Sequence, residues 1–439
     1  MPAPERRTRW DLTAAAVLAV AVLAISAVLW WVSDARRTVV TTAPGASGTL
    51  NGSAWDDQTL PMGQLPSVLF EAWRAPSPAT PIPVATAGSV VTGAEGMVAG
   101  RDFRSGAIRW SYRRDLPLCT VVAAFHQVVA VYRRGETCSE VTALDGASGR
   151  RGPQRTGPVE APTRLVAAGH LLAASGQRYL EVWRSDLVRT LEYGRLPTPL
   201  QPATQPRPDC LHGSMALSSA SRSEGADGEG ANGAGSQLAV VERCAGERPR
   251  LTVQRSDPKE PEQPEVIFSV LLPGQQARVV ALNADRVAVA LPDPARLVVL
   301  DGQGKTVAEH PLSVPDADLR GYPAGGVVDV TTTTTELYWF TGSATVALDT
   351  AELRPHWTRP GSLGTGTEVA GRLLLPVPGA LAVLDTATGE QIGALPVDRG
   401  DYRGPVATAS AGGIVLEHRG DTLVALRSEL SATNRTTGR

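Results

Sequence analysis

Four cysteines are the residues in this sequence whose spacing most directly suggests chemistry. They are Cys119, Cys138, Cys210 and Cys244. None belongs to a Cys-x-x-Cys pair, which argues against a zinc ribbon or a thioredoxin-like redox site. In each successive pair the first cysteine precedes a strand-like segment and the second follows the next one. We therefore predict two disulfides, Cys119–Cys138 and Cys210–Cys244, which need an oxidising compartment. Four reduced, buried cysteines are the alternative.

Histidines and short motifs suggest no second site. The six histidines are scattered, without the HxxxH or HExxH spacing of metal ligands. Gly364-Thr-Gly366 lacks the rest of a dinucleotide-binding pattern, and no GxSxG nucleophile motif occurs. Arg399-Gly-Asp401 and Arg419-Gly-Asp421 spell an adhesion tripeptide, but both stand where a hairpin must reverse, so turn chemistry is the better interpretation. We predict no metal site, no cofactor and no catalytic residue.

Aspartates recur at positions that a turn explains. Leu381–Leu395 reads as a strand, a tight turn and a second strand. Asp385 can accept hydrogen bonds from backbone N–H groups two residues on, and Gly389 supplies the left-handed backbone that closes the turn. Related segments occur elsewhere in the chain. We assign a structural role in repeat turns to Asp102, Asp145, Asp301, Asp349 and Asp385.

The elements that carry these aspartates form an internal repeat. Most copies are spaced near the roughly 40–50 residues expected of a four-stranded propeller blade. Such a unit cannot bury its own apolar faces and must stack on neighbours, and a ring of stacked sheets leaves only short edges. We predict an all-β, eight-bladed propeller, with the eight units anchored at Asp102, Asp145, Arg184, Arg255, Asp301, Asp349, Asp385 and Arg427.

The best-kept copies resemble the repeat of pyrroloquinoline-quinone-type propellers. That repeat runs Asp-Gly, two strand residues, Ala-Leu-Asp, a turn with Thr-Gly, and then tryptophan. The resemblance covers roughly Leu69 to Arg427. It implies a fold shared by quinone-dependent dehydrogenases and by the non-enzymatic scaffold lipoprotein of the BamB type. The residues that carry it are Glu95-Gly96, Asp102, Ser105-Gly106 and Trp110; Ala143-Leu144-Asp145 with Ser148-Gly149; and Asp385 with Thr388-Gly389.

The sequence lacks the residues that a quinone-dependent dehydrogenase needs for its chemistry. Such an enzyme needs an aromatic floor for the quinone, oxygen ligands for calcium and a base aspartate, and often has a vicinal disulfide. This chain has no adjacent cysteines, its aromatic content is 5%, and its repeat aspartates are explained by turns. We therefore expect a non-enzymatic protein, with a quinoprotein-like enzyme or a small-ligand sensor using the central channel as the alternative.

The N-terminal region predicts a membrane anchor. Leu12–Val32 is uncharged and about as long as a bilayer is thick. Arginines precede it, and Trp30-Trp31 closes it, where indoles favour the membrane interface. A cleaved signal peptide is the competing interpretation, but its apolar run is usually shorter and the site that follows here is poor. The segment has no nearby cysteine for lipidation, unlike the scaffold lipoprotein.

These features divide the chain into segments. We predict a cytoplasmic tail (1–11), a transmembrane helix (12–32), a flexible linker (33–66), the propeller (67–427) and a C-terminal tail (428–439). A polar, small-residue stretch at 218–236 predicts a disordered insertion. Trp73 lies in a strand-like segment, Ser67–Arg74, that resembles the end of a repeat. Because the last unit lacks such an ending, we expect this strand to complete the last blade.

Together these features predict a single-pass plasma-membrane protein with its propeller outside the cytoplasm. Its expected partners are envelope or membrane proteins, which it would bind as a scaffold. The net charge of −2 gives no indication of nucleic-acid binding.

Overall fold

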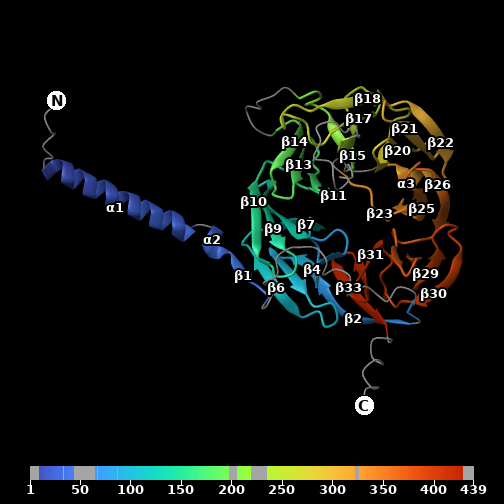
Figure 1. The fold of residues 1–439 in the computed structure, drawn as a ribbon, viewed down its shortest axis with the longest axis horizontal. Coiled ribbons are helices and arrows are strands. Elements are labelled where there is room, and N and C mark those ends of the chain that lie inside the picture. The colour runs from blue at the N-terminus through green and yellow to red at the C-terminus, as the bar shows by residue number, and fades with distance from the viewer. Residues whose placement is uncertain are drawn as a thin grey trace, which may run out of the picture.

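A ring of eight β-sheets forms the body of the protein in the computed structural model (Figure 1). The structure describes residues 9–32, 34–43, 65–66, 68–86, 88–196, 205–218, 235–321 and 326–428. Seven sheets have four strands and one has five, and neighbouring strands pair antiparallel in the order of a meander. The predicted eight-bladed propeller is therefore confirmed.

Within the described residues the helices are α1 (Arg9–Val32), α2 (Asp34–Arg37) and α3 (Asp316–Leu319). Blade 1 contains β3 (Val84–Thr86), β4 (Ser89–Ala94), β5 (Met97–Arg101), β6 (Ile108–Arg113) and the added β1 (Val39–Thr41). Blade 2 contains β7 (Leu118–Ala124), β8 (Gln127–Arg134), β9 (Thr137–Asp145) and β10 (Arg151–Thr156). Blade 3 contains β11 (Leu165–Ala168), β12 (Leu171–Ala174), β13 (Tyr179–Arg184) and β14 (Arg189–Gly194). Blade 4 contains β15 (Leu211–Ser218), β16 (Gln237–Arg243), β17 (Arg250–Arg255) and β18 (Val266–Leu271).

Blade 5 contains β19 (Arg278–Leu282), β20 (Arg286–Leu291), β21 (Arg296–Asp301) and β22 (Thr306–Pro311). Blade 6 contains β23 (Val330–Thr332), β24 (Glu336–Phe340), β25 (Ala344–Asp349) and β26 (Pro355–Pro360). Blade 7 contains β27 (Thr367–Val369), β28 (Arg372–Val377), β29 (Ala380–Asp385) and β30 (Gln391–Pro396). Blade 8 contains β31 (Val406–Ala411), β32 (Ile414–Arg419), β33 (Thr422–Ser428) and β2 (Leu69–Pro76).

Burial along the strands explains the ring. The second and third strands of a blade are apolar on both sides: β12 is buried at all of its positions, and β21 at all but its ends. Each sheet therefore has to pack between two neighbouring sheets, as a strand buried on both faces requires. Outer strands such as β22 alternate between exposed and half-buried positions, because they form the rim.

The ring is closed by the N-terminal strand, as the sequence suggested. β2 pairs antiparallel with β33, so that residues about 350 positions apart become neighbours, for example Leu69 with Ser428 and Thr422 with Pro76. β2 thereby supplies the outer strand of blade 8 (Figure 1). A blade assembled from both ends of the domain opposes opening of the ring from either end.

Tryptophans on outer strands lock one blade to the next. The Trp73 indole N–H donates to the Phe103 carbonyl at 2.9 Å, and a side chain at Gly106 would collide with its ring. Trp110 makes the same contacts in blade 2, with the Gly146 carbonyl and with Gly149. Glycine is required at these turn positions both for its positive φ and because the indole lies against it.

The same contact recurs between blades 6 and 7. The Trp357 indole donates to the Thr386 carbonyl at 2.9 Å and lies against Gly389. The tryptophan that ends one repeat therefore binds the turn of the next one. Through Trp73 this contact also links blade 8 to blade 1, across the point of closure.

The segment between the apolar helix and the propeller differs from the flexible linker predicted for 33–66. α2 lies within it, and β1 adds a fifth strand to the rim of blade 1, with Val40 opposite Tyr112. Ala43 is buried and donates its N–H to the Ser148 carbonyl. The sequence did not reveal this because β1 has only three residues and obtains its partners from β6. Residues 44–64 lie outside the described residues.

Other boundaries shift slightly. α1 begins at Arg9 and so includes part of the tail predicted for 1–11. Most of the insertion predicted for 218–236 and nearly all of the tail predicted for 428–439 lie outside the described residues. The run of threonines at 331–335 is divided between a strand and a turn: β23 ends at Thr332, and Thr333 begins the turn to β24.

We predict that the Trp73 contact holds the ring closed. Trp73→Ala removes a partly buried indole and its hydrogen bond, and should lower the free energy of unfolding by about 2–3 kcal/mol. Trp73→Phe keeps most of the packing and should cost only about 1 kcal/mol. Thermal and denaturant unfolding of the full chain would measure both. Wild-type stability in Trp73→Ala would show that the contact does not matter for closure.

Candidate functional site

Both predicted disulfides are present. Cys119 is bonded to Cys138 and Cys210 to Cys244, with Cα–Cα distances of 6.1 and 4.4 Å. In each case one cysteine lies at the start of a blade and the other beside the turn between its second and third strands. Because these turns and the connections between blades share one side of the ring, both disulfides lie there. We call that side the connector face; it carries, among others, the connections 114–117, 361–366 and 397–405.

The five repeat aspartates lie on the opposite face, in the turns between third and outer strands. Asp385 accepts hydrogen bonds from the Ala387 and Thr388 N–H groups and from the Thr388 hydroxyl. Asp102, Asp145, Asp301 and Asp349 accept equivalent backbone hydrogen bonds in their own turns. These hydrogen bonds to backbone N–H groups lower the pKa of Asp102, Asp301 and Asp385. The aspartates are too far apart around the ring to form a common site.

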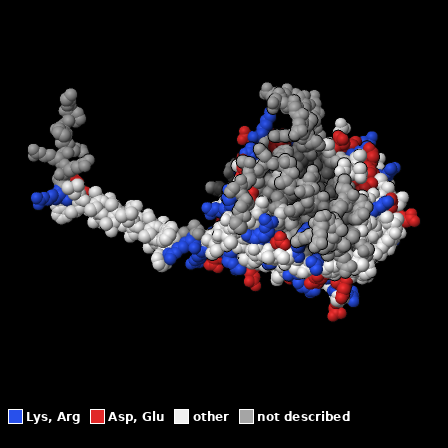
Figure 2. Space-filling model, turned by 60° about the horizontal axis from the view of Figure 1, so that its bottom comes forward, with Lys and Arg blue, Asp and Glu red and all other residues white. Residues whose placement is uncertain are grey.

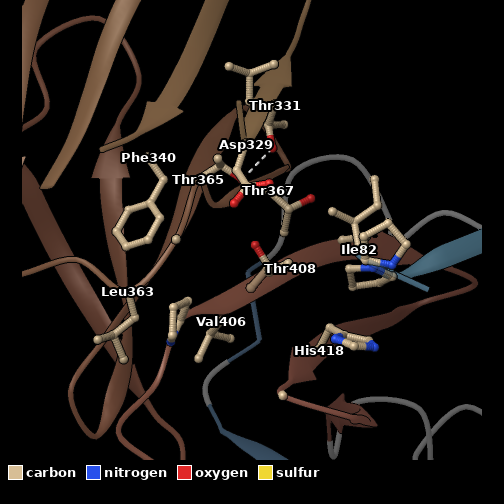
Figure 3. A pocket seen from close by; sticks show the side chains of 18 of the residues that line it. Ile82, Asp329, Thr331, Phe340, Leu363, Thr365, Thr367, Val406, Thr408 and His418 are labelled. Atoms are coloured by element: carbon tan, nitrogen blue, oxygen red, sulfur yellow. Dashed lines mark hydrogen bonds between the residues drawn. The ribbon is translucent and has the colours of Figure 1, made fainter. Parts of the chain in front are cut away.

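A cavity of about 520 Å³ opens within the ring near the connector face. It lies in the sector of blades 6, 7, 8 and 1, because β23, β27 and β31 and the approach to β3 supply its walls. Figure 3 shows Asp329 and the threonines gathered at one end, with Phe340 and Leu363 on one wall and Ile82 and His418 on the other side. This cavity is the candidate functional site.

One long connection shapes the cavity. The connection between blades 5 and 6 is described at residues 312–321 and 326–329. Asp318 in α3 accepts hydrogen bonds from Thr341 and Ser343 of blade 6, and Val327 then forms a parallel bridge with Met215 on the inner strand of blade 4. Val327 therefore lies beside the inner strand of blade 4, and Asp329, two residues later, lines the cavity.

Asp329 is the acidic residue in the cavity wall. Its side chain is open to the cavity but is surrounded by the ring, and the resulting desolvation raises its pKa. The positive charges of Arg164 and Arg278, from blades 3 and 5, lower it in part. No described residue donates a hydrogen bond to this carboxylate.

Hydroxyl groups line the cavity beside Asp329. The Thr331 hydroxyl is 2.6 Å from that of Thr365, and Thr367 is 3.5 Å from Ser410. The Thr408 hydroxyl is buried and has no hydrogen-bond partner among the described residues. Buried hydroxyls are usually satisfied, so one that borders a cavity marks a position where a ligand could bind.

His418 closes the cavity on the side of blade 8, but its ring is occupied. Its Nε2 lies 2.8 Å from the Ser77 carbonyl and 3.2 Å from the Thr80 hydroxyl. Burial lowers its pKa, against the effect of the Ser77 carbonyl. This histidine therefore joins the N-terminal segment to blade 8.

A second polar cluster lies buried between blades 2, 3 and 4. Glu181 accepts hydrogen bonds from Arg155, Tyr179 and Trp183, at 2.7–3.0 Å. Farther along, Tyr193 donates to Glu242 at 2.6 Å, and burial raises the pKa of Glu242. These groups satisfy one another in the interior, which is the pattern of a structural network and not of a catalytic centre.

The two adhesion tripeptides also have a structural explanation. Arg399 donates to the fully buried Glu417 at 2.6 and 3.0 Å, and Arg419 donates to the same carboxylate at 2.8 Å. Both arginine side chains are themselves buried. They are therefore not available to a receptor, and they hold the turns of blades 7 and 8 together.

Across the residues that the structure describes, no group of three or more His, Cys, Asp or Glu side chains could hold a metal ion. One helix there is long and apolar enough to cross a membrane, over Arg9–Trp31, and none of it is buried in the protein.

Comparison with known proteins finds only distant structural similarity. No protein-family model and no curated protein sequence matches the chain. The structure of BamB from Moraxella catarrhalis is similar over 82% of this chain and 100% of its own, at 12% identity and a TM-score of 0.49. The structure of Sqt1 from Saccharomyces cerevisiae is similar over 83% of this chain and 99% of its own, at 10% identity and a TM-score of 0.48. The structure of the dihydro-heme d1 dehydrogenase NirN, in complex with DHE, is similar over 75% of this chain and 67% of its own, at 12% identity and a TM-score of 0.42.

The sequence analysis did not identify the cavity residues. Thr365 was considered only within a pattern that fails as a dinucleotide-binding motif. Asp329 belongs to no motif, and its place in the cavity depends on tertiary contacts such as the pairing of Val327 with Met215. The one available signal was the unusual length of the connection between the two clear repeats of blades 5 and 6.

The buried His212 predicts a specific pH dependence. Burial lowers its pKa to about 4 from 6.5, outweighing the Gly176 carbonyl, and its ring stacks on Tyr193 at 5.5 Å. Since the unfolded chain then binds the extra proton, the stabilising contribution is complete above pH 6.5 and is lost as the pH falls towards 4. Between pH 7 and pH 5 the wild-type chain should lose about 2 kcal/mol from this group.

His212→Phe keeps an aromatic ring beside Tyr193 but cannot be protonated. Its unfolding free energy, measured by denaturant titration at both pH values, should fall by about 2 kcal/mol less than that of the wild type. His418 remains in both proteins and titrates in the same direction. Equal losses in the two proteins would contradict the neutral, buried state of His212.

Proposed function

We propose that this protein is a membrane-anchored, extracytoplasmic propeller that binds other proteins of the cell envelope without catalysing a reaction. The observation that carries the proposal is the direct joining of the apolar helix to the propeller. Only residues 33–38 separate the end of α1 from β1, which is already part of blade 1. A bilayer around α1 would therefore hold the rim of blade 1 at its surface.

The exposure of α1 supports a lipid environment. Its large apolar side chains are about 60% exposed or more, as at Leu18, Leu23 and Trp31. Leaving such side chains in water costs roughly 1.5–3 kcal/mol each, so the helix requires an apolar environment. Arg36 stacks over Trp31 at the end nearer the propeller, and Figure 2 shows blue basic atoms at both ends of a white helix.

The disulfides support a location of the propeller outside the cytoplasm. Cys119–Cys138 and Cys210–Cys244 account for all four cysteines of the chain, and such bonds persist in oxidising compartments. With the propeller outside, α1 would run outward from a cytoplasmic N-terminus.

Photo-crosslinking in intact cells tests this proposal. The full chain, tagged at its C-terminus and isolated from crosslinked membranes, should recover a specific protein partner at several times background. The matched control is the tagged segment 1–43, which keeps α1 and β1 but lacks the propeller. Recovery of the same proteins by both chains would contradict propeller-mediated binding.

The same membranes report the topology. A maleimide–polyethylene glycol reagent should modify the denatured chain only after reduction, because both cysteine pairs are bonded. Protease added outside intact spheroplasts should remove the propeller. Free thiols, or a propeller protected until lysis, would place it in the cytoplasm.

The cavity favours one alternative, a sensor or quinoprotein-like enzyme that holds a small ligand in the ring. Pyrroloquinoline quinone with calcium would then raise the melting temperature of the full chain, because a ligand that binds only the folded state stabilises it. We expect no shift, since the described cavity wall offers a single carboxylate for calcium. A concentration-dependent rise would favour the alternative.

A further inference from the structure

The cavity near the connector face has the chemical features of a receptor for a basic side chain. Its volume of about 520 Å³ exceeds that of a single amino acid, so it can admit a side chain together with part of its peptide. Its acidic end and its apolar walls are separate regions (Figure 3). A ligand that matches both has a polar, hydrogen-bond-donating head and an apolar stem.

The acidic end requires donors that the protein does not supply. Asp329 lies within the ring with no hydrogen-bond donor from the described residues, and desolvation of its carboxylate is offset only in part by Arg164 and Arg278. Neither arginine belongs to the cavity wall. The buried Thr408 hydroxyl is also unpartnered among the described residues. A carboxylate that is open to the cavity, partly desolvated and without a donor from the described residues would gain charge-assisted hydrogen bonds from an ammonium or guanidinium group.

The walls suit an aliphatic stem. Ile82 is 49% exposed in the cavity, and Phe340 and Leu363 face it from blade 6 and the approach to blade 7. Lysine and arginine side chains combine three or four methylenes with a charged head, and they bury the stem along apolar surfaces while the head finds polar partners. Small amines lack the stem, and neutral aliphatic side chains lack the head.

We propose that this cavity binds a lysine or arginine side chain of a partner protein, with its charged head at Asp329 and its stem between Ile82 and Leu363. This deepens the proposed function, on which it rests: it names the recognition chemistry of a propeller that binds proteins. The cavity is lined in part by the inner strands β23, β27 and β31, so the partner would present the side chain from a protruding loop or a chain end.

A peptide selection tests the proposal. Random heptapeptides displayed on phage would be selected against the full chain held in lipid nanodiscs, and enriched sequences would be synthesised in matched pairs. One member keeps its lysine or arginine, and the other has norleucine or citrulline, which preserve the stem but remove the charge. We expect the charged member to bind at least about tenfold more tightly in fluorescence polarisation.

Variants assign the binding to the cavity. Asp329→Asn removes the charge with little change in shape and should weaken the charged peptide by about tenfold or more. Asp401→Asn removes an equal charge from an exposed position on the same connection as Tyr402, and should leave binding within about twofold. Ile82→Trp places a larger side chain at an exposed position of the cavity wall, and it should weaken the binding of both peptides of a pair. Circular dichroism would verify that each variant is folded.

Several outcomes would overturn the proposal. These are the absence of basic peptides after selection, wild-type affinity in Asp329→Asn, or a melting-temperature rise with pyrroloquinoline quinone and calcium. Failure of the cavity proposal can be distinguished from failure of the proposed function. If Asp329→Asn captures the same membrane partner as the wild type, the cavity assignment is wrong and protein binding stands. If the wild-type propeller captures no partner, the broader proposal fails.

Discussion

Closure of the ring is the constraint on which the rest of this structure depends. The middle strands of each sheet are apolar on both faces, so every blade must be covered on both sides. An open row of eight sheets would leave two apolar faces in water. Pairing of β2 with β33 removes that exposure, because one blade takes strands from both ends of the domain. The packing of all other blades follows from this closure.

Besides the aliphatic clusters between blades, two kinds of contact recur among the described residues. Between blades 8 and 1, 1 and 2, and 6 and 7, a tryptophan of one outer strand lies on the turn glycine of the next blade. Around blade 3 the corresponding region is filled by buried ion pairs and hydrogen bonds centred on Glu181. Apolar contacts tolerate pH changes, whereas a buried histidine beside such a network does not. Acid should therefore weaken the sector of blades 3 and 4 through His212.

The cavity results from an exception to the regular ring. Most blades are joined by short connections, but in the longer connection between blades 5 and 6 Val327 pairs with Met215 on the inner strand of blade 4. This segment brings an acid into a channel whose other walls are threonines and aliphatic side chains. Closure by β2 contributes the remaining wall, because Ile82 follows that strand on the way to blade 1. One face of a repetitive fold thereby acquires a single, asymmetric site.

The sequence by itself determined the repeat, the blade number, the disulfide pairs and the strand that closes the ring. Each depends on local pattern: Asp385 and Gly389 specify a turn whatever surrounds them, and the cysteines of one blade are brought together by neighbouring strands. Tertiary structure alone decided that β1 joins blade 1, that Glu417 accepts hydrogen bonds from two arginines, and that Asp329 lies in the cavity wall. These contacts join residues from different blades or far along the chain, and no local propensity encodes such distances. The fold was therefore readable in advance, whereas the candidate site became visible only once the ring had closed around it.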